Sequence, residues 1–308
     1  MTTSSTLAPP RFALLGAFAI VYVIWGSTFL GILFAIQTLP PFLMASVRFF
    51  IAGGLLYAWS RLVSGATPPT PAEWRTTALI GVLLLVGGNG LLVWSEQRIP
   101  SGVAALFVGT VPCFMALIDW LRPGGVRPSG LVIAGLLLGL LGLVWLVGPD
   151  ALMGGGRADF IGAAVVVLCS FSWAAGSIYS RHVATPRSPF LSTAMQMLGG
   201  GAALLLLSVV LGEPWHFDAS AVSMRSLLGL SYLIVFGSIV AFSAYIWLLR
   251  VSTPARVSTY AYVNPVIAVI LGWAVAGEAL TARIGIAAAI IVSGVALITL
   301  APGKATAG

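Results

Sequence analysis

Ten apolar runs, each long enough to cross a lipid bilayer, constrain this chain more than any other feature. The chain of 308 residues is 59% hydrophobic and only 7% charged, whereas a soluble domain is about 25% charged. About 20 mostly apolar residues suffice for a spanning helix. The sequence therefore predicts an all-α integral membrane protein with ten transmembrane helices, at residues 12–36, 41–61, 75–95, 99–121, 128–148, 159–181, 189–212, 226–249, 255–276 and 281–301.

The two halves of the chain repeat each other. Pro112 aligns with Pro265 at an offset of 153 residues, and Trp25 aligns with Trp173 at an offset of 148. Tryptophan and proline are scarce here, so matches at a constant spacing indicate a duplicated unit. Each unit holds five helices, and an odd number turns the second unit upside down, as in many transporters with a central site. We expect a tail at 1–11, a first repeat at 12–150, a second, inverted repeat at 151–302 and a tail at 303–308, with a cavity between the repeats.

The basic residues predict the orientation. With a cytoplasmic N-terminus, ten of them lie in inside segments: Arg11, Arg61, Arg75, Arg122, Arg127, Arg181, Arg187, Arg250, Arg256 and Lys304. Four lie in outside loops: Arg98, Arg157, Arg225 and Arg283. This asymmetry predicts that both termini are cytoplasmic.

The same distribution argues against nucleic acid as a partner. The net charge of +7 is spread over short connections instead of forming one basic patch. The sequence lacks the Gly-x-x-x-x-Gly-Lys-Ser/Thr pattern that cradles ATP phosphates. His182 and His216 both fall in loops, so no metal site is predicted, and we expect no cofactor.

Arg48 is the costliest residue inside a predicted helix. It lies a few residues outside the midpoint of the 41–61 helix, where an arginine costs at least ~2.5 kcal/mol and must face the protein interior. Two roles remain open: the guanidinium awaits an anionic group of a substrate, or it bonds to helix-end carbonyls and ties helices together. Gln196 takes the equivalent position in the second repeat, which favours an interior location for both.

Other polar residues concentrate on the predicted helices at 75–95, 99–121, 159–181, 226–249 and 255–276. Because such groups avoid lipid, these helices should surround the cavity. Aromatic side chains recur beside them, and aromatic walls with a few hydrogen-bonding groups suit a small amphiphilic molecule. The candidate substrate-binding residues are Trp25, Arg48, Asn89, Thr110, Trp173, Ser177, Gln196, Ser243, Tyr260 and Asn264.

Pro112 and Pro265 fall in the middle of the 99–121 and 255–276 helices. A proline inside a helix removes one backbone hydrogen bond and kinks the helix. In one interpretation, the symmetric pair of kinks provides two places where the helices bend, one for the gate at each end of the cavity. In the other, the kinks are static and only shape the packing. Both interpretations remain open.

The acidic residues all lie in loops or within about a turn of a helix end. Proton-driven carriers usually keep Asp, Glu or His inside the membrane as a relay. We therefore expect facilitated movement of a substrate down its own gradient. Asp119 is expected to pair with Arg122, one helical turn away.

Four segments carry a family pattern: Trp25-Gly26-Ser27-Thr28, Arg48-Phe49 after Pro41, Pro265-Val266-Ile267-Ala268, and Gly277-Glu278-Ala279-Leu280. Over nearly its whole length the chain resembles the drug/metabolite transporter superfamily, specifically the EamA-type exporters. The first repeat departs from the pattern, because Gly124-Gly125 replaces the Gly-Glu pair. The resemblance implies export of amino acids, other small metabolites or drugs across a bacterial inner membrane by alternating access, and the chain is similar to exporters of aromatic amino acids.

The sequence thus predicts a facilitative exporter whose cargo is an aromatic or other neutral amino acid. An exporter of drugs or sugars, a proton-coupled carrier and a channel remain alternatives. A phosphorylated cargo would require several basic residues in the cavity, and a cation would require a buried carboxylate. An intramembrane hydrolase would require a base beside its serine, which neither histidine supplies. The sequence does not decide between a monomer and a homodimer.

Overall fold

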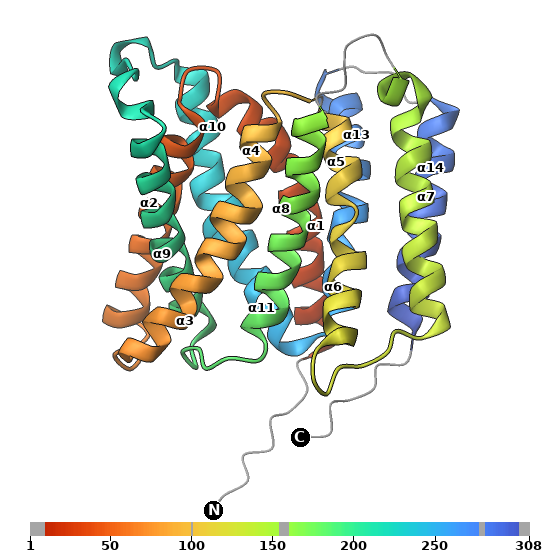
Figure 1. Cartoon of the computed structure of the whole chain (residues 1–308), viewed down its shortest axis with the longest axis horizontal. Coiled ribbons are helices and arrows are strands. Elements are labelled where there is room, and N and C mark those ends of the chain that lie inside the picture. Colours follow the sequence, from red (N-terminus) through yellow and green to blue (C-terminus); the bar gives the residue numbers. More distant parts are fainter. Residues whose placement is uncertain (1–9, 100, 154–159, 277–280, 302–308) are drawn as a thin grey trace, which may run out of the picture.

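The computed structural model describes residues 10–99, 101–153, 160–276 and 281–301. These residues form helices joined by short connections, with no strand among them (Figure 1). The first half contains α1 (Arg11–Ala35), α2 (Pro41–Leu62), α3 (Pro71–Gly81), η1 (Val82–Gly90), α4 (Leu91–Ser95), α5 (Ser101–Val108), α6 (Val111–Leu121) and α7 (Gly130–Met153). The second half contains α8 (Phe160–Ser180), α9 (Pro189–Val210), η2 (Glu213–Trp215), η3 (Ala219–Ala221), α10 (Met224–Tyr232), η4 (Leu233–Phe242), α11 (Ser243–Val251), α12 (Pro254–Val257), α13 (Tyr260–Ala276) and α14 (Ala282–Leu300).

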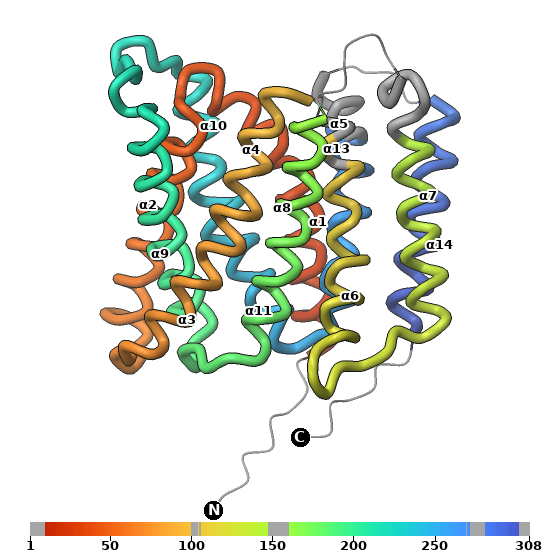
Figure 2. The backbone as a smooth tube through the Cα atoms, in the orientation of Figure 1, coloured from red at the N-terminus to blue at the C-terminus, as the bar shows by residue number. Residues whose placement is uncertain are grey.

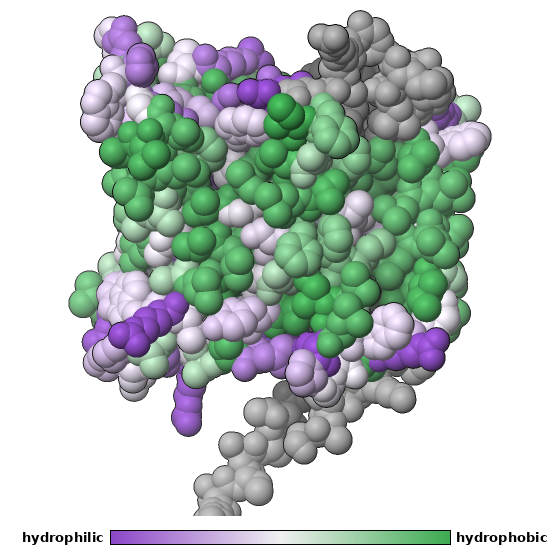
Figure 3. Space-filling view, viewed as in Figure 1, coloured by the Kyte–Doolittle hydropathy of each residue, from purple (hydrophilic) through white to green (hydrophobic). Residues whose placement is uncertain are grey.

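The helices run between the two ends of the bundle (Figure 2). Among the described residues, seven helices are long and apolar enough to cross a membrane. The apolar helices at Leu106–Leu121 and Gly130–Leu146, together with the α12–α13 segment, bring the number to ten. Figure 3 shows an apolar band between two polar rims, as contact with lipid requires. The prediction of an all-α integral membrane protein with ten helices is confirmed.

The first and last helices distinguish the two ends of the bundle. α1 begins and α14 ends at the same end, which we call the terminal end (Figure 1). The connection from α1 to α2 lies at the opposite end, which we call the distal end. The predicted boundaries at 150/151 and 302/303 stay predictions, and Glu278 with its motif lies outside the described residues.

α3 begins four residues before the start predicted for its apolar run. The hydroxyl of Thr70 accepts a hydrogen bond from the Glu73 N–H at 3.2 Å, and Glu73 Oε2 accepts one from the Thr70 N–H at 2.7 Å. This reciprocal pair satisfies backbone donors that a helix N-terminus leaves free. Pro71 fits the first helical position because its missing N–H would have no partner there.

Equivalent helices of the two halves pack against each other, α2 on α9 and α7 on α14. Glycines permit this close approach: a Cβ on Gly135 would lie 2.6 Å from the carbonyl oxygen of Gly294, and one on Gly53 would lie 2.9 Å from Met197 Cβ. Small residues at a helix interface let two backbones meet, because lipid supplies no hydrophobic driving force between helices.

The two predicted proline kinks differ in the structure. In the first half the helix is interrupted at Gly109–Thr110, and Pro112 lies in the first turn of the new helix α6. In the second half the interruption lies at Ser258–Thr259, and Pro265 lies inside α13. Pro112 therefore begins a helix where a backbone N–H is not needed, whereas Pro265 removes a hydrogen bond within one. A role in gating remains a prediction for both.

Two π-helices, η1 and η4, interrupt their spans at corresponding places in the two halves. At the offset of 153 residues, η1 corresponds to residues 235–243, which overlap η4. The wider turn disturbs the regular backbone pairing, and α8 supplies side-chain donors to η1: Ser172 Oγ donates to the Leu83 carbonyl at 2.8 Å, and Cys169 Sγ donates to the Gly88 carbonyl at 3.0 Å. These elements were not predicted from the sequence, and both contribute residues to the candidate functional site.

Candidate functional site

A cavity lies between the two halves of the bundle. The space that admits the centre of a water molecule measures about 90 Å³, several times the ~10–15 Å³ that holds one water. The lining is mostly apolar and aromatic with a few polar groups, as is usual for small-molecule sites. It consists of Trp25, Thr28, Phe29, Ile32, Arg48, Phe49, Leu85, Gly88, Asn89, Leu92, Val108, Val111, Cys169, Trp173, Gly237, Phe242, Tyr260 and Asn264.

Six of the ten residues predicted to bind substrate line this cavity: Trp25, Arg48, Asn89, Trp173, Tyr260 and Asn264. Asn264 also links two helices: one end of its side-chain amide lies 3.1 Å from the Tyr22 carbonyl oxygen and 3.0 Å from that of Tyr260, and the amide nitrogen at this position donates to both. The sequence predicts how deep in the membrane each of these residues lies, and the structure brings them together from both halves.

The other four candidates lie outside the cavity lining. Thr110 donates to the Phe107 carbonyl at 2.6 Å, and Ser177 donates to the Trp173 carbonyl at 2.7 Å. Gln196 is buried on α9, and its Nε2 donates to a hydroxyl one turn earlier. Ser243 is buried at the start of α11. Their part in substrate binding stays a prediction.

Arg48 is held at the cavity wall by the other half of the protein. It is 4% exposed, and its Nε donates to Ser238 Oγ of η4 at 2.7 Å. Its Cζ lies 4.8 Å from the centroid of the Phe49 ring. The contact with Ser238 fits the interpretation that Arg48 ties helices together, although the partner is a side-chain hydroxyl and not a helix-end carbonyl. Nη1 has no hydrogen-bond partner among the described residues, so part of the guanidinium is left for another role.

An aromatic cluster, which we call the aromatic floor, lies on the terminal side of Arg48. It consists of Trp25, Trp173, Phe242, Tyr245 and Tyr260. Trp25 and Trp173, which are equivalent in the two repeats, meet edge to face with ring centroids 5.5 Å apart. Tyr245 is fully buried and accepts a hydrogen bond from Trp173 Nε1 at 2.9 Å. Edge-to-face pairs of this kind favour one fixed arrangement, so the floor forms an ordered part of the cavity wall on its terminal side.

Several residues of this site were missed by the sequence analysis. Neither Tyr245 nor Gly237 was among the candidate substrate-binding residues. A Cβ on Gly237 would lie 3.0 Å from Arg48 Nη2, and the Gly237 carbonyl accepts from Trp25 Nε1 at 3.2 Å. A glycine inside an otherwise apolar run was the available signal, because it permits close approach of another group.

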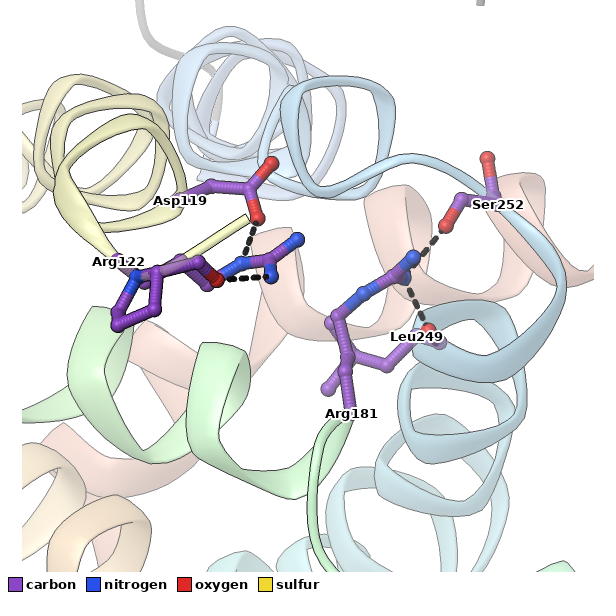
Figure 4. A network of polar contacts seen from close by, with 6 residues as sticks. Asp119, Arg122, Arg181, Leu249 and Ser252 are labelled. Carbon is purple, nitrogen blue, oxygen red and sulfur yellow. Dashed lines mark hydrogen bonds and ion pairs between the residues drawn. The ribbon is translucent and has the colours of Figure 1, made fainter. Parts of the chain in front are cut away.

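A network of polar contacts lies at the terminal end, where α8 and α11 end. Figure 4 shows Arg181, just after α8, donating from Nη1 to the carbonyls of Leu249 and, at 2.6 Å, Ser252. These carbonyls end α11, where a cation is favoured by the helix dipole. Beside it, Arg122 Nε pairs with Asp119 Oδ1 at 2.7 Å (Figure 4), as predicted.

Substitution of Arg181 by glutamine is expected to loosen the terminal end. A cysteine placed at Ser177, in a chain whose Cys113 and Cys169 are replaced by serine, should react about 5- to 10-fold faster with a membrane-impermeant thiol reagent, since two charge-assisted hydrogen bonds are lost. Arg187→Gln, at an exposed residue before α9, is the control and should leave the rate unchanged. Equal rates in the Arg181 and Arg187 variants would contradict a closing role for Arg181.

Glu96 follows α4 in the distal connection and is buried in part. Its Oε1 is inaccessible and has no hydrogen-bond partner among the described residues. Burial raises the pKa of this carboxyl to about 8. The group is one helical turn beyond Leu92, which lines the cavity. The sequence placed Glu96 in a connection but could not show that its carboxyl turns inward.

The raised pKa of Glu96 makes stability depend on pH. Between the ordinary carboxyl pKa of about 4.5 and the folded value of about 8, the folded protein holds a proton that the unfolded chain has released, so stability falls as pH rises through this window. We expect the melting temperature in detergent to fall between pH 5 and pH 9, and Glu96→Gln to flatten that fall. Asp218→Asn is the control, because hydrogen bonds from Ser220 lower the pKa of Asp218 further below the window. A fall that persists unchanged in Glu96→Gln would contradict this assignment.

Comparison with known proteins gives consistent matches over most of the chain. The pattern of the EamA-like transporter family matches residues 12–148 and 160–300. The chain is similar to the "Uncharacterized inner membrane transporter YedA" of Escherichia coli strain K12, at 38% identity over 93% of this chain and 90% of that protein. It is also similar to a "Probable amino-acid metabolite efflux pump" of Salmonella typhimurium strain LT2, at 26% identity over 89% of this chain and 91% of that protein. A crystal structure with 24% identity superposes with a TM-score of 0.77 over 95% of this chain and 98% of that one, which shows a shared fold.

Proposed function

Because the chain belongs to the EamA-like transporter family and is a membrane transporter, we propose that it exports small amphiphilic metabolites, foremost aromatic or other neutral amino acids, by alternating access. The observation that carries this proposal is the composition of the cavity wall. One guanidinium with a free nitrogen lies beside an aromatic cluster, so the wall can bind an anionic group and an apolar body together. The name of the Salmonella relative, which mentions an amino-acid metabolite, supports the same class of cargo.

Alternating access is supported by the contacts on the terminal side of the cavity. The aromatic floor joins helices of both halves, and Arg181 joins α8 to the end of α11 within the second half; we take both to close the route to that end. We propose that the terminal end is cytoplasmic and that the protein lies in the inner membrane, as the basic residues of the connections and the Escherichia coli relative suggest. Loading of cargo for export then requires this end to open.

A transport assay tests the proposed function. Purified protein in liposomes loaded with unlabelled phenylalanine should accumulate labelled phenylalanine from outside by exchange, and an inward gradient of unlabelled substrate should drive net uptake at equal pH on both sides. Saturation and acceleration by internal substrate are expected of a carrier. Transport that never saturates would indicate a channel, and competition by sugars or drugs but by no amino acid would contradict the proposed cargo.

A proton-coupled carrier is a second candidate, and Glu96 favours it. The carboxyl lies in the distal connection, one helical turn beyond Leu92 of the cavity lining, and burial raises its pKa to about 8, so it can exchange a proton near neutral pH. In the same liposomes, a pH gradient imposed without a substrate gradient separates the two mechanisms. Net uptake under that condition, abolished in Glu96→Gln, would establish coupling, whereas facilitated transport predicts no net uptake.

A further inference from the structure

Two buried polar atoms on the cavity-lining residues have no hydrogen-bond partner within the described part of the chain. They are Nη1 of Arg48 and Oδ1 of Asn89. A guanidinium nitrogen can only donate hydrogen bonds, whereas an amide oxygen can only accept them. Buried groups of both kinds are nearly always paired, and an unpaired one calls for an explanation. A ligand that brings one acceptor and one donor would satisfy both atoms at once.

The remaining contacts of Arg48 leave Nη1 as a buried nitrogen without a hydrogen-bond partner among the described residues. Nε is bonded to Ser238 Oγ. Nη2 lies where a Cβ on Gly237 would come within 3.0 Å, and the ring of Phe49 packs against the guanidinium. The group is therefore held in position before any ligand arrives, which reduces the entropy cost of binding.

The second atom comes from the π-helix of the first half. Asn89 lies in η1 directly after Gly88, and both line the cavity. A Cβ on Gly88 would come within 2.5 Å of the Trp173 ring, so this turn of η1 lies against the aromatic floor. An ammonium group bonded to Asn89 Oδ1 would thus also lie in the neighbourhood of the Trp173 ring, and aromatic rings attract cations.

The charge of the cavity decides which ligands fit. Among the described lining residues, Arg48 alone carries a charge at neutral pH. A simple cation would be repelled by it, and a simple anion would leave Asn89 Oδ1 unpaired. A zwitterion supplies both an acceptor for Arg48 and a donor for Asn89.

We propose that Arg48 Nη1 binds the carboxylate, and Asn89 Oδ1 the ammonium group, of an α-amino acid whose side chain lies against the aromatic floor. This inference rests on the proposed function and deepens it, because it names the atoms that recognise the cargo. It predicts discrimination against compounds that keep the apolar side chain but lack either charged group.

Isothermal titration of the purified full-length protein with three matched ligands tests this inference. Phenylalanine carries both groups, phenethylamine lacks the carboxylate, and 3-phenylpropionate lacks the ammonium group. The wild-type protein should bind phenylalanine at least 10-fold more tightly than either analogue. Arg48→Gln should abolish the preference over phenethylamine and keep the preference over 3-phenylpropionate. Asn89→Leu should do the reverse, and Asn89→Asp, which retains an acceptor, should restore the wild-type pattern.

Failure of the inference differs from failure of the proposed function. If the wild-type protein binds none of a panel of neutral amino acids, the proposed cargo is wrong and this inference is wrong with it. If phenylalanine binds and transport proceeds, but neither variant changes the two preferences, the assignment of Arg48 and Asn89 is overturned alone. Melting curves identify variants that fail to fold, and Arg48→Met and Asn89→Ala, which remove the same groups, then replace them in the same comparison.

Discussion

Replacing Arg48 with glutamine is expected to lower the rate of phenylalanine exchange in liposomes by about 10- to 150-fold. Hydrogen bonds to charged groups contribute about 1.5–3 kcal/mol, and each 1.4 kcal/mol is a factor of ten. Glutamine keeps a polar side chain at the cavity wall but removes the positive charge and the several N–H donors of the guanidinium group. The expected loss therefore measures the interaction with the carboxylate, provided that the variant melts within a few degrees of the wild-type protein.

Arg61→Gln is the matched control for Arg48→Gln. Arg61 lies in the last turn of the same helix, α2, at the terminal end, and its guanidinium bonds to the carbonyl of Ala66. The substitution removes the same charge from the same element without touching the cavity lining. Exchange should change by less than about 2-fold, since a single hydrogen bond at a partly exposed site is worth little. Similar losses in both variants would mean that Arg48 acts through global charge or stability, and its role in binding cargo would be wrong.

Replacing Gly81 with leucine is expected to abolish the folded protein, whereas Gly54→Leu should be tolerated. A Cβ on Gly81 would lie 2.2 Å from the backbone oxygen of Gln196 and 2.9 Å from the Gly200 nitrogen. Backbone atoms of a packed helix cannot move aside, and overpacking alone costs about 1–3 kcal/mol before any such clash. At Gly54 a Cβ would meet nothing within 4 Å.

Yield after size-exclusion chromatography and the melting temperature check this pair. Both variants add the same leucine to an apolar span, so hydrophobicity and helix propensity change alike. We expect less than about a tenth of the wild-type monodisperse yield for Gly81→Leu and a near-normal yield for Gly54→Leu, in line with close packing of helix backbones at small residues. A well-folded Gly81→Leu protein would show that α3 and α9 do not pack as described.

The number and kind of helices could be predicted from the sequence because length and hydrophobicity decide whether a segment spans a bilayer. The start of α3 could not be read from hydrophobicity, since the Thr70 and Glu73 cap lies outside the apolar run. The π-helices η1 and η4 were also not predicted. A π-helix has wider turns than an α-helix, but in a helix that is apolar on most sides this difference does not change the hydrophobic pattern of the sequence.

The candidate site was predicted in part for a similar reason. Arg48 and Trp25 were recognised because charge and large aromatic groups are scarce at that depth. The sequence gives the depth of a polar residue in the membrane but not the direction in which it points. Gln196 is as deep as Arg48 yet lies at the packing of α9 against α3, where its backbone oxygen faces Gly81. The direction becomes known only when helices from both halves are in place.

The central claim is that the cavity opens alternately to the two ends, and distances between α1 and α8 test it most directly. These helices meet at Trp25 and Trp173, near the middle of the bundle, and can tilt about that contact. Spin labels at the exposed residues Phe12 and His182 report the terminal end, and labels at Gln37 and Phe160 report the distal end, with Cys113 and Cys169 replaced by serine. On addition of saturating phenylalanine, pulsed electron resonance should show one distance distribution gaining a longer component while the other gains a shorter one. Two distributions that lengthen together, or that both stay unchanged while transport proceeds, would contradict alternating access.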